Sequence, residues 1–329
     1  MGDKLLEAYD LKKYYPLRRG LLDVIRGHGA RYLRAVDGVS FHIEKGEVFC
    51  LVGESGCGKT TTGRLVLRLI EPTSGKVLFR GEDITSAGDE ELGWFRRKAQ
   101  IIFQDPYESL NPHMRIYDIV TEPLYIHGEL TTREERIDAA SKLLTEVSLV
   151  PPEEFVYRYP HELSGGQRQR VAIARALSLR PEFIVADEPV SMLDMSIRAE
   201  ILQLMLGIRE KFNISYLFIT HDLAVARIIC DRVAIMYLGK IVEEGPAEQV
   251  ITNPMHPYTR ALISAVPLPD PRHKIGEIPI KGEVPSPVNI PSGCRFHPRC
   301  PFATDKCRAE EPPAVEVEPG HFVRCWLHG

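Results

Sequence analysis

The chain has 329 residues, of which 44% are hydrophobic and 26% are charged. This length suits about two domains, and the composition excludes a disordered or fibrous protein. A net charge of −4 and an isoelectric point near 6.3 argue against a dedicated nucleic-acid binder, which usually carries a basic face.

The first half of the chain contains a strand–loop–helix pattern. Residues 35–43 nearly alternate in polarity and predict a strand, and Glu44–Glu47 predicts a turn. The apolar run Val48–Val52 predicts a buried strand. It leads directly into Gly53–Thr60, with the sequence GESGCGKT, and Thr60–Ile70 is predicted to be a helix. This order is the context that a phosphate-binding loop requires.

The glycines of this loop let backbone N–H groups approach phosphate oxygens, and the helix N-terminus adds a favourable dipole. Lys59 is expected to reach the β- and γ-phosphates, and Thr60 to supply a hydroxyl to Mg²⁺. A chance glycine-rich turn is the alternative, which the eight-residue match opposes. The residues expected to bind the nucleotide here are Gly53, Glu54, Ser55, Gly56, Cys57, Gly58, Lys59, Thr60 and Thr61.

The stretch that follows is predicted to be helical, with a helical subdomain at about residues 106–165. Thr132–Glu135 has the pattern of a capping box, and apolar residues then recur at helical spacing. Residues 183–186 and 216–219 are two further short apolar strands. Strands alternating with helices predict an α/β fold with a mostly parallel sheet.

The strand at residues 183–186 ends in two acids. Asp187 is expected to lie beside Mg²⁺, as the Walker-B acid does in this class of site. Glu188 is expected to polarise the attacking water as a general base. A pair of helix N-capping residues is the alternative interpretation.

Leu163–Gln167 reads LSGGQ and is followed by RQRVAIARA. These residues resemble the signature of ATP-binding-cassette (ABC) ATPases. Other positions resemble further motifs of that family, in the family's order: Gln104 the Q-loop glutamine, Ser191–Asp194 the D-loop, His221 the switch histidine, and Tyr15, or alternatively Tyr14, the aromatic residue that stacks on adenine.

The resemblance implies a P-loop NTPase fold with a RecA-like, mostly parallel core, an antiparallel β subdomain and a helical subdomain. It also implies that two cassettes sandwich two ATP molecules head to tail, and that a serine at a helix N-terminus caps the γ-phosphate bound by the opposite subunit. The residues expected across that interface are Ser164, Gly165, Gly166, Gln167 and Asp194.

The implied catalytic residues are Glu188, His221 and Gln104, and the implied Mg²⁺ ligands are Thr60, Gln104 and Asp187. His221 would hold the γ-phosphate and the water in line. The chain departs from the family at Met192, where alanine is usual, and in the long segment Pro16–Leu33 after Tyr15.

Within the family, essentially the whole chain resembles the ATPase subunits of dipeptide and oligopeptide importers. The resemblance rests on Phe103–Pro112, on His256–Leu262 and on a proline-rich tail with cysteines. The elongated segment before Val36 suits the second (F-type) of the two paralogous ATPases. The resemblance to these importer subunits implies that ATP hydrolysis to ADP and phosphate powers peptide uptake, with oligosaccharide or nickel import as alternatives.

The resemblance further implies four partners: a paralogous ATPase in a heterodimer, two transmembrane permease subunits and an extracytoplasmic solute-binding protein. Asp105, Tyr107 and Glu108 are candidates for the permease contact, and an ordinary polar turn is the alternative. A soluble cassette ATPase acting on nucleic acid or ribosomes is the rival function. A single cassette without heptads or a basic patch opposes it.

No apolar run approaches the ~18–20 residues that cross a bilayer, and the first residues lack the apolar core of a signal peptide. We therefore expect a peripheral protein on the cytoplasmic face of the cell membrane.

The composition shifts towards proline near Pro267. This predicts a nucleotide-binding domain at residues 1–265, followed by a proline-rich linker and a cysteine-rich extension at residues 266–329. The extension holds Cys294, Cys300, Cys307 and Cys325. Four thiolates can bind Zn²⁺ or an iron–sulfur cluster.

The wide spacing of these cysteines is similar to the cluster-bearing tails of peptide-importer ATPases, which implies a [4Fe–4S] cluster, with zinc or free thiols as alternatives. Of the other cysteines, Cys50 is expected in a strand core and Cys230 on a helix.

Overall fold

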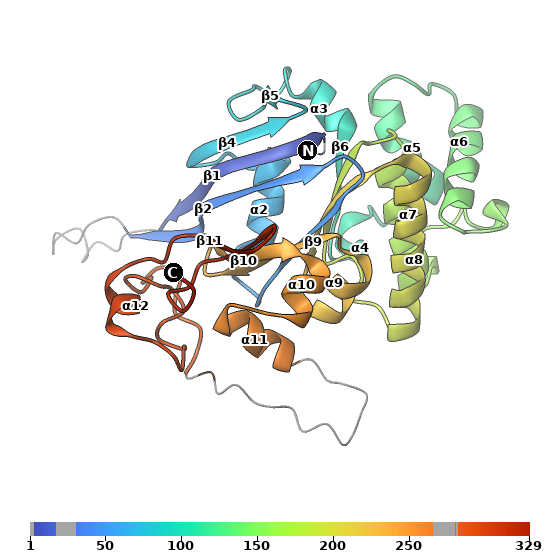
Figure 1. Cartoon of the computed structure of the whole chain (residues 1–329). Helices are drawn as coiled ribbons and strands as arrows, with labels where there is room; N and C mark the ends of the chain where they lie inside the picture. The colour runs from blue at the N-terminus through green and yellow to red at the C-terminus, as the bar shows by residue number, and fades with distance from the viewer. Residues whose placement is uncertain (1–2, 18–30, 266–279, 281) are drawn as a thin grey trace. The chain divides into compact units, whose positions relative to one another are not determined.

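The computed structural model describes residues 3–17, 31–265, 280 and 282–329, which form two compact units (Figure 1). We call Glu44–Glu47 with Ala87–Phe218 the helical unit, and Asp3–Ile43, Val48–Ser86 and Ile219–Gly329 the P-loop unit. The first part of the predicted proline-rich linker, and most of the long segment Pro16–Leu33, lie outside the described residues.

Two strands of the helical unit pair in parallel: β6 (Ala99–Ile102) lies beside β7 (Phe183–Asp187), with Ala99 opposite Phe183. All five residues of β7 are buried, which explains its continuous apolar sequence. Strand β8 (Ser215–Thr220) begins in this unit and is also fully buried. The two apolar strands predicted from the sequence are therefore confirmed.

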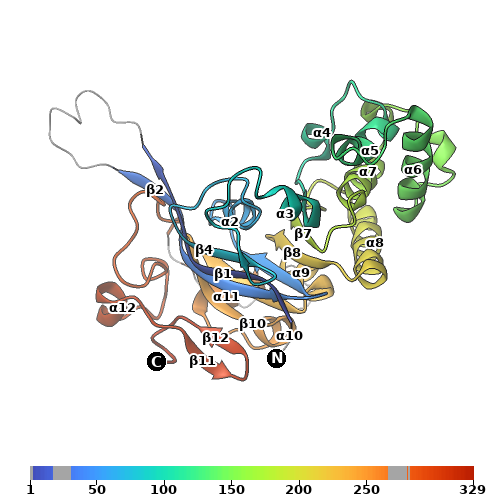
Figure 2. The same ribbon diagram turned by 90° about the horizontal axis from the view of Figure 1, so that it is seen from above.

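The helices of this unit include the predicted insert. Helix α5 (Ile116–Ile126) packs on α6 (Arg133–Glu146) and α7 (Gly165–Leu177), and Figure 2 shows the three helices together. The capping box before α6 is confirmed, because Thr132 Oγ1 accepts the Glu135 N–H at 3.3 Å while Glu135 Oε2 accepts the Thr132 N–H at 2.9 Å. The remaining helices are α3 (Gly93–Lys98), α4 (Pro106–Ser109), η1 (Pro152–Glu154), η2 (Pro160–Glu162) and α8 (Met195–Phe212).

The P-loop unit contains a four-stranded sheet in the order β2-β1-β4-β5. Strands β1 and β4 are antiparallel, with Leu6 opposite Phe79. The bounds are β1 (Lys4–Pro16), β2 (Tyr32–Glu44), β4 (Ser74–Phe79) and β5 (Glu82–Asp83). This is the expected antiparallel subdomain.

The other strands of this unit follow the order β11-β12-β10-β9-β3. Strands β3 and β9 are parallel, whereas β10 is antiparallel to both β9 and β12. The strand before the glycine-rich loop is confirmed over its whole predicted length. The bounds are β3 (Val48–Val52), β9 (Arg232–Tyr237), β10 (Lys240–Pro246), β11 (Val315–Glu318) and β12 (His321–Val323).

Helix α2 (Lys59–Val66) follows the glycine-rich loop and ends before the predicted Ile70, since Arg68 adopts a left-handed φ of 54°. The other helices of the unit are α9 (Leu223–Ile229), α10 (Ala247–Thr252), α11 (Pro257–Ser264) and α12 (Asp305–Ala309). None of the helices among the described residues combines the length and hydropathy needed to cross a membrane.

The cysteine-rich extension is joined to the sheet of the P-loop unit through β12, where Val323 pairs with Glu243 of β10. At this junction the Glu243 and His321 side chains are completely buried, and His321 Nε2 lies 2.8 Å from Glu243 Oε1. Glu243 also accepts the backbone N–H groups of Met255 and His256 at 2.7 and 2.9 Å. Three hydrogen bonds thus satisfy a buried carboxyl group.

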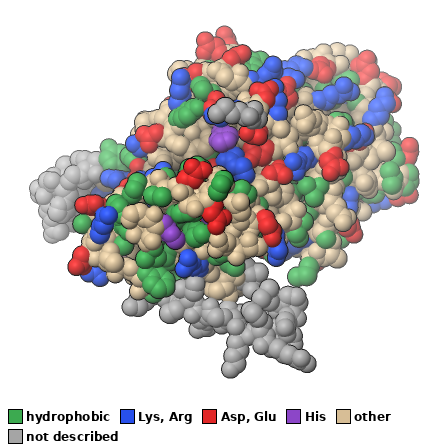
Figure 3. Space-filling view, in the orientation of Figure 1, with side chains coloured by type: hydrophobic (Ala, Val, Ile, Leu, Met, Phe, Trp, Pro, Cys, Tyr) green, Lys and Arg blue, Asp and Glu red, His purple; other side chains and the backbone are tan. Residues whose placement is uncertain are grey.

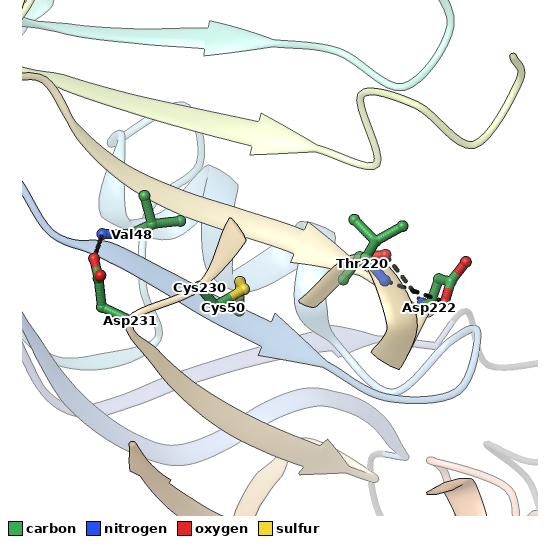
Figure 4. Close-up of a disulfide and its surroundings, with 7 residues drawn as sticks. Val48, Cys50, Thr220, Asp222, Cys230 and Asp231 are labelled. Carbon is green, nitrogen blue, oxygen red and sulfur yellow. Dashed lines mark hydrogen bonds between the residues drawn. A yellow bond between two sulfur atoms is a disulfide. The ribbon is translucent and has the colours of Figure 1, made fainter. Parts of the chain in front are cut away.

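Cys50 lies in the core of strand β3, as expected, but the structure joins it in a disulfide to Cys230, which was expected only to pack on a helix (Figure 4). Cys230 is the C-cap of α9 and lies two residues before the start of β9, the parallel neighbour of β3. Asp231 binds the same strand, because its Oδ2 accepts the Val48 N–H at 2.8 Å. Two adjacent residues therefore fix the end of α9 to the strand that leads into the glycine-rich loop.

Candidate nucleotide-binding site

The glycine-rich loop connects β3 to α2 in the P-loop unit, and two of its glycines are required by close contact. A Cβ atom on Gly53 would lie 2.2 Å from the Met236 carbonyl oxygen. At Gly58, φ is 110° and a Cβ atom would lie 2.2 Å from the Ala35 carbonyl oxygen. Larger residues cannot occupy either position without moving backbone. The loop is therefore seated tightly against its own unit.

Lys59 is almost completely buried in this loop. Its Nζ donates to the carbonyl oxygens of Gly53 at 2.7 Å and Glu54 at 3.1 Å. The ammonium group is thus held by the backbone of the loop itself, in a motif whose lysine is expected to reach phosphate oxygens. The Glu54 N–H donates to the hydroxyl of Tyr258 at 3.0 Å. Sequence reasoning missed Tyr258, although it lies in the His256–Leu262 segment that carries the family resemblance.

The two candidate adenine-binding tyrosines differ in their surroundings. The Tyr14 hydroxyl donates to Asp37, and burial together with this bond raises the pKa of Tyr14 to about 12. The Tyr15 ring is 38% exposed, with the Lys13 ammonium 5.2 Å from its centroid. Tyr15 is therefore the exposed member of the pair, whereas the Tyr14 hydroxyl is engaged with Asp37 of its own unit.

His221 also belongs to the P-loop unit. It follows the last residue of β8, and its side chain is exposed. The next residue, Asp222, begins α9 by accepting the Ala224 N–H at 2.8 Å, and its own N–H bonds to Thr220 Oγ1 (Figure 4). This turn fixes the backbone on both sides of His221.

In the helical unit the structure brings together two predicted catalytic residues that are far apart in sequence. Gln104 Nε2 donates to Glu188 Oε2 at 3.1 Å. Glu188 directly follows Asp187, which is buried at the end of β7. Glu188 has a φ of 48°, and its carbonyl oxygen accepts both the N–H and the hydroxyl of Ser191.

The signature sequence begins α7 as the resemblance predicts. Ser164 is the N-cap and forms a capping box with Gln167. Ser164 Oγ accepts the Gln167 N–H at 3.3 Å, and Gln167 Oε1 accepts the Ser164 N–H at 2.9 Å. A Cβ atom on Gly166 would lie 2.7 Å from Ile197 Cγ2 of α8. The exposed Ser164 and two glycines therefore leave a helix N-terminus accessible to an anion.

The D-loop segment precedes α8, and Asp194 is the N-cap position of that helix. Arg198 holds the segment, donating to the carbonyl oxygens of Leu193 at 2.8 Å and Ser191 at 3.2 Å. Met192 is 63% exposed, so the departure from alanine removes no core contact. Asp194 is exposed beside it.

The four cysteines of the extension are free thiols. Burial is the main reason that the pKa values of Cys294 and Cys325 rise to about 11, and it also raises the pKa of Cys300. Backbone N–H groups two residues further on oppose this rise, at Phe296, Phe302 and Leu327. The Cys307 sulfur lies 3.3 Å from Thr304 Oγ1.

Among residues 3–17, 31–265, 280 and 282–329, no three His, Cys, Asp or Glu side chains lie close enough together to hold a single metal ion. The Mg²⁺ ligands expected from the sequence are divided between the units, with Thr60 in one and Gln104 and Asp187 in the other. Hydroxyl, amide and carboxylate oxygens form a donor set that suits Mg²⁺.

Comparisons with known proteins agree with this geometry. Residues 36–191 match the family described as "ABC transporter", and residues 242–307 match "Oligopeptide/dipeptide transporter, C-terminal region". The chain is 50% identical, over 99% of its length and 90% of the relative's, to the probable peptide ABC transporter ATP-binding protein y4tS of Sinorhizobium fredii. It is 49% identical to the oligopeptide transport ATP-binding protein AppF of Bacillus subtilis, over 99% of this chain and 98% of that protein.

Among solved structures, the dimeric ATP-binding cassette MJ0796 bound to ADP and phosphate is similar over 74% of this chain and 99% of that chain. The TM-score is 0.63 and the sequence identity is 29%. The fold, the ordered motifs and both matched regions agree with the resemblance seen in the sequence. The chain therefore belongs to the ABC transporter ATPases, in the branch of oligopeptide and dipeptide transport ATP-binding proteins.

Proposed function

We propose that this chain is the ATP-hydrolysing subunit of an importer that takes up dipeptides and oligopeptides. The contact between Gln104 and Glu188 carries the catalytic part of this proposal. It places an amide donor on the carboxylate that follows Asp187, in the arrangement expected of a general base whose orientation is fixed. The relatives named above, which are peptide transport proteins by name, support the choice of cargo.

Each proposed group has a task in the reaction, and Gln104 has two. Lys59 and the loop N–H groups bind the phosphates, and Glu188 accepts a proton from the attacking water. His221 and Gln104 orient that water and the γ-phosphate. Thr60, Asp187 and Gln104 would hold Mg²⁺, which neutralises charge that develops on the phosphates. Tyr15 stacks on the adenine.

The exposed N-terminus of α7 supports a second ATP contact made by a partner chain. Ser164, Gly165 and Gly166 would cap the γ-phosphate held by a paralogous cassette, and Gln167 and Asp194 would line the same interface. Hydrolysis then removes the phosphate that joins the two chains. The heterodimer with a second ATPase follows from the F-type resemblance.

The permease contact is proposed on the surface that follows Gln104. Tyr107 is 63% exposed at the start of α4, where Asp105 Oδ1 accepts its N–H at 2.7 Å. The Arg168 guanidinium lies over the Tyr107 ring, 3.9 Å from its centroid, in a cation–π contact. Exposed aromatic surface of this kind is typical of a partner interface. Asp105, Tyr107 and Glu108 would receive a cytoplasmic helix of a permease subunit, and the chain would then lie at the membrane's inner face.

The extension is proposed to hold a [4Fe–4S] cluster. The observation that supports it is the presence of Cys294, Cys300, Cys307 and Cys325 in one extension, all four as free thiols. In such a cluster each thiolate binds a different iron, and a single zinc is the alternative. Three of the sulfurs also face a backbone N–H group, a contact that tunes iron–sulfur sites. Division into residues 1–265 and 266–329 remains our proposal for the domain boundary.

A nucleic-acid function receives no comparable support. On the face shown in Figure 3, basic side chains are interspersed with acidic ones rather than gathered in a stripe. Nucleic-acid binding would require a concentrated basic surface.

The test is uptake of labelled peptides by the assembled transporter reconstituted in vesicles with ATP inside or outside. We expect peptide uptake that requires ATP and is competed by unlabelled di- and oligopeptides. Uptake of an oligosaccharide or of nickel instead, with no peptide competition, would assign a different cargo to the same ATPase. No ATP-dependent uptake of any of these would refute the proposed importer function.

A further inference from the structure

The cysteine-rich extension contacts the phosphate-binding loop directly through one ion pair. Arg299 Nη1 donates to Glu54 Oε2 at 2.8 Å, and Nη2 donates to Glu54 Oε1 at 3.1 Å. The two residues are 245 positions apart, and both lie in the P-loop unit. A two-point contact of this kind is geometrically specific and stronger than a neutral hydrogen bond.

The surroundings of Arg299 hold it in that position. Its side chain is only 9% exposed, and its guanidinium carbon lies 5.8 Å from the Tyr237 ring centroid and 5.9 Å from that of Phe296. Phe296 in turn packs on Tyr258, the residue whose hydroxyl accepts the Glu54 N–H. Glu54 is therefore held at its carboxylate by the extension and at its backbone by Tyr258, against which Phe296 of the extension packs.

The charge of Glu54 makes this contact important for nucleotide binding. Glu54 lies inside a loop whose N–H groups and Lys59 are arranged for a polyanion, and its carboxylate is 30% exposed. An unpaired carboxylate at this position would repel the phosphates of ATP. Arg299 neutralises that charge and turns the carboxylate towards the extension.

We propose that Arg299 is a positioning residue for ATP binding: it neutralises Glu54 and thereby makes the phosphate-binding loop receptive to ATP. This inference rests on the proposed role of Gly53–Thr60 in binding phosphates. Arg299 acts through Glu54 and does not itself contact the nucleotide. Because Arg299 lies between Cys294 and Cys300, the extension becomes part of the nucleotide-binding apparatus.

The test measures the dissociation constant of ATP for the purified full-length chain by titration calorimetry. Arg299→Ala should weaken binding by about tenfold, within the range of typical coupling energies between sites. Adding Glu54→Gln should restore affinity to within about twofold of wild type, because the repulsive charge is gone. The defect of Arg299→Ala should also shrink at high salt, since the exposed part of the charge is screened.

Arg308→Ala is the matched control, because Arg308 is in the same extension and pairs with the fully exposed Asp305 at 3.2 Å rather than with the loop. It should leave ATP affinity unchanged. If Arg299→Ala does not fold, Arg299→Lys, which keeps the charge, and the double variant Glu54→Gln with Arg299→Ala decide the question. Both should bind ATP nearly normally, and weak binding by the folded double variant would refute the inference.

Two further outcomes are decisive. Normal affinity in folded Arg299→Ala would also refute the positioning role. Lys59→Ala separates this inference from the proposed site: loss of ATP binding there, with normal binding in Arg299→Ala, rejects only the role of Arg299. Normal ATP affinity in Lys59→Ala would reject the phosphate-binding site itself.

Discussion

Glu188 has a φ of 48°, in a region that non-glycine residues seldom occupy. Such backbone conformations cost on the order of 1–3 kcal/mol and persist where surrounding contacts determine them. Here the Ser191 N–H and hydroxyl both bind the Glu188 carbonyl oxygen. The strained turn directs the carboxylate to Gln104 Nε2, which explains how one residue follows a buried strand and still meets a distant glutamine.

The Gln104–Glu188 contact predicts a specific pH effect. Gln104→Glu places a second carboxylate about where the amide now lies, and like charges raise the pKa of one member of the pair. A general base works only when deprotonated, so the acidic limb of the kcat–pH profile should move upward by roughly one unit or more. Gln104→Ala is the control and should lower kcat without moving the limb. A limb that stays in place in both variants would contradict the contact.

His256 carries a second prediction, on stability. Complete burial is the main reason that the pKa of His256 falls to about 4, and its Nδ1 accepts the Tyr258 N–H as the N-cap of α11. The unfolded chain binds this proton below pH 6.5, whereas the folded chain resists it until about pH 4. The free energy of unfolding therefore suffers no loss from His256 above pH 6.5, and it decreases as the pH falls from 6.5 towards 4.

At pH 4 this loss amounts to about 3 kcal/mol. His256→Asn keeps a side-chain acceptor for the helix N-terminus but does not titrate. Denaturant unfolding from pH 7 to 4 should show a steeper loss in wild type than in the variant. Parallel curves would show that His256 is not held neutral.

At the scale of elements, α7 combines a stability role with a proposed binding role at its first turn. The Ser164–Gln167 capping box satisfies donors at that end, and the cap contributes about 1 kcal/mol. Ser164 is exposed and the next three residues are partly exposed, which supports the proposed contact with an anion from another chain. The two roles are separable by choice of substitution.

Ser164→Arg should leave ATP binding to the isolated chain unchanged and block ATP-dependent assembly with the paralogous subunit. The long side chain would occupy the place of the γ-phosphate across the interface. Ser164→Ala serves as the control: it loses the cap and about 1 kcal/mol of stability, but does not obstruct the interface. Light scattering of the two subunits with ATP measures assembly. Normal assembly of Ser164→Arg would contradict the sandwich.

We expect the affinity of the extension for a metal to depend on pH. Thiols whose pKa values are near 11 are protonated at neutral pH in the metal-free chain, and they must lose protons to bind a metal. Metal affinity should therefore rise with pH between 6 and 9, with proton release on loading. Anaerobic reconstitution followed by iron, sulfide and zinc analysis measures it. Metal loading that does not depend on pH would contradict thiol ligation. One zinc per chain without iron would show that the extension holds zinc and not the proposed cluster.

At the scale of the whole molecule, the proposed catalytic residues are divided between two units. The phosphate-binding loop and His221 belong to the P-loop unit, whereas Gln104, Glu188 and the signature belong to the helical unit. Lys59→Ala should therefore lose ATP binding, whereas Glu188→Gln should still bind ATP and lose hydrolysis.

The sequence predicted the features that depend on local patterns. Apolar runs identified β3 and β7, and the Thr132–Glu135 capping box located the start of α6. Each signal lies within a few residues, so chain topology is not needed to interpret it.

Pairs formed over long separations could not be predicted in the same way. The Cys50–Cys230 disulfide spans 180 positions and depends on β9 lying beside β3. The Glu54–Arg299 pair spans 245 positions and depends on how the extension packs against the loop. Polarity and spacing contain no information on these pairings, whereas the family motifs identified Gln104 and Glu188 singly without revealing their contact.

The measurement that tests the central claim most directly is ATP binding and hydrolysis by Glu188→Gln in the assembled transporter, with Glu210→Gln, an exposed carboxylate of α8, as control. ATP should bind to the Glu188→Gln transporter as to wild type, while hydrolysis at this site falls by roughly 10²–10⁴-fold, the usual contribution of a general base. Glu210→Gln should behave as wild type. Near-normal hydrolysis by Glu188→Gln would contradict the account, because the residue placed beside Gln104 would then not be the base.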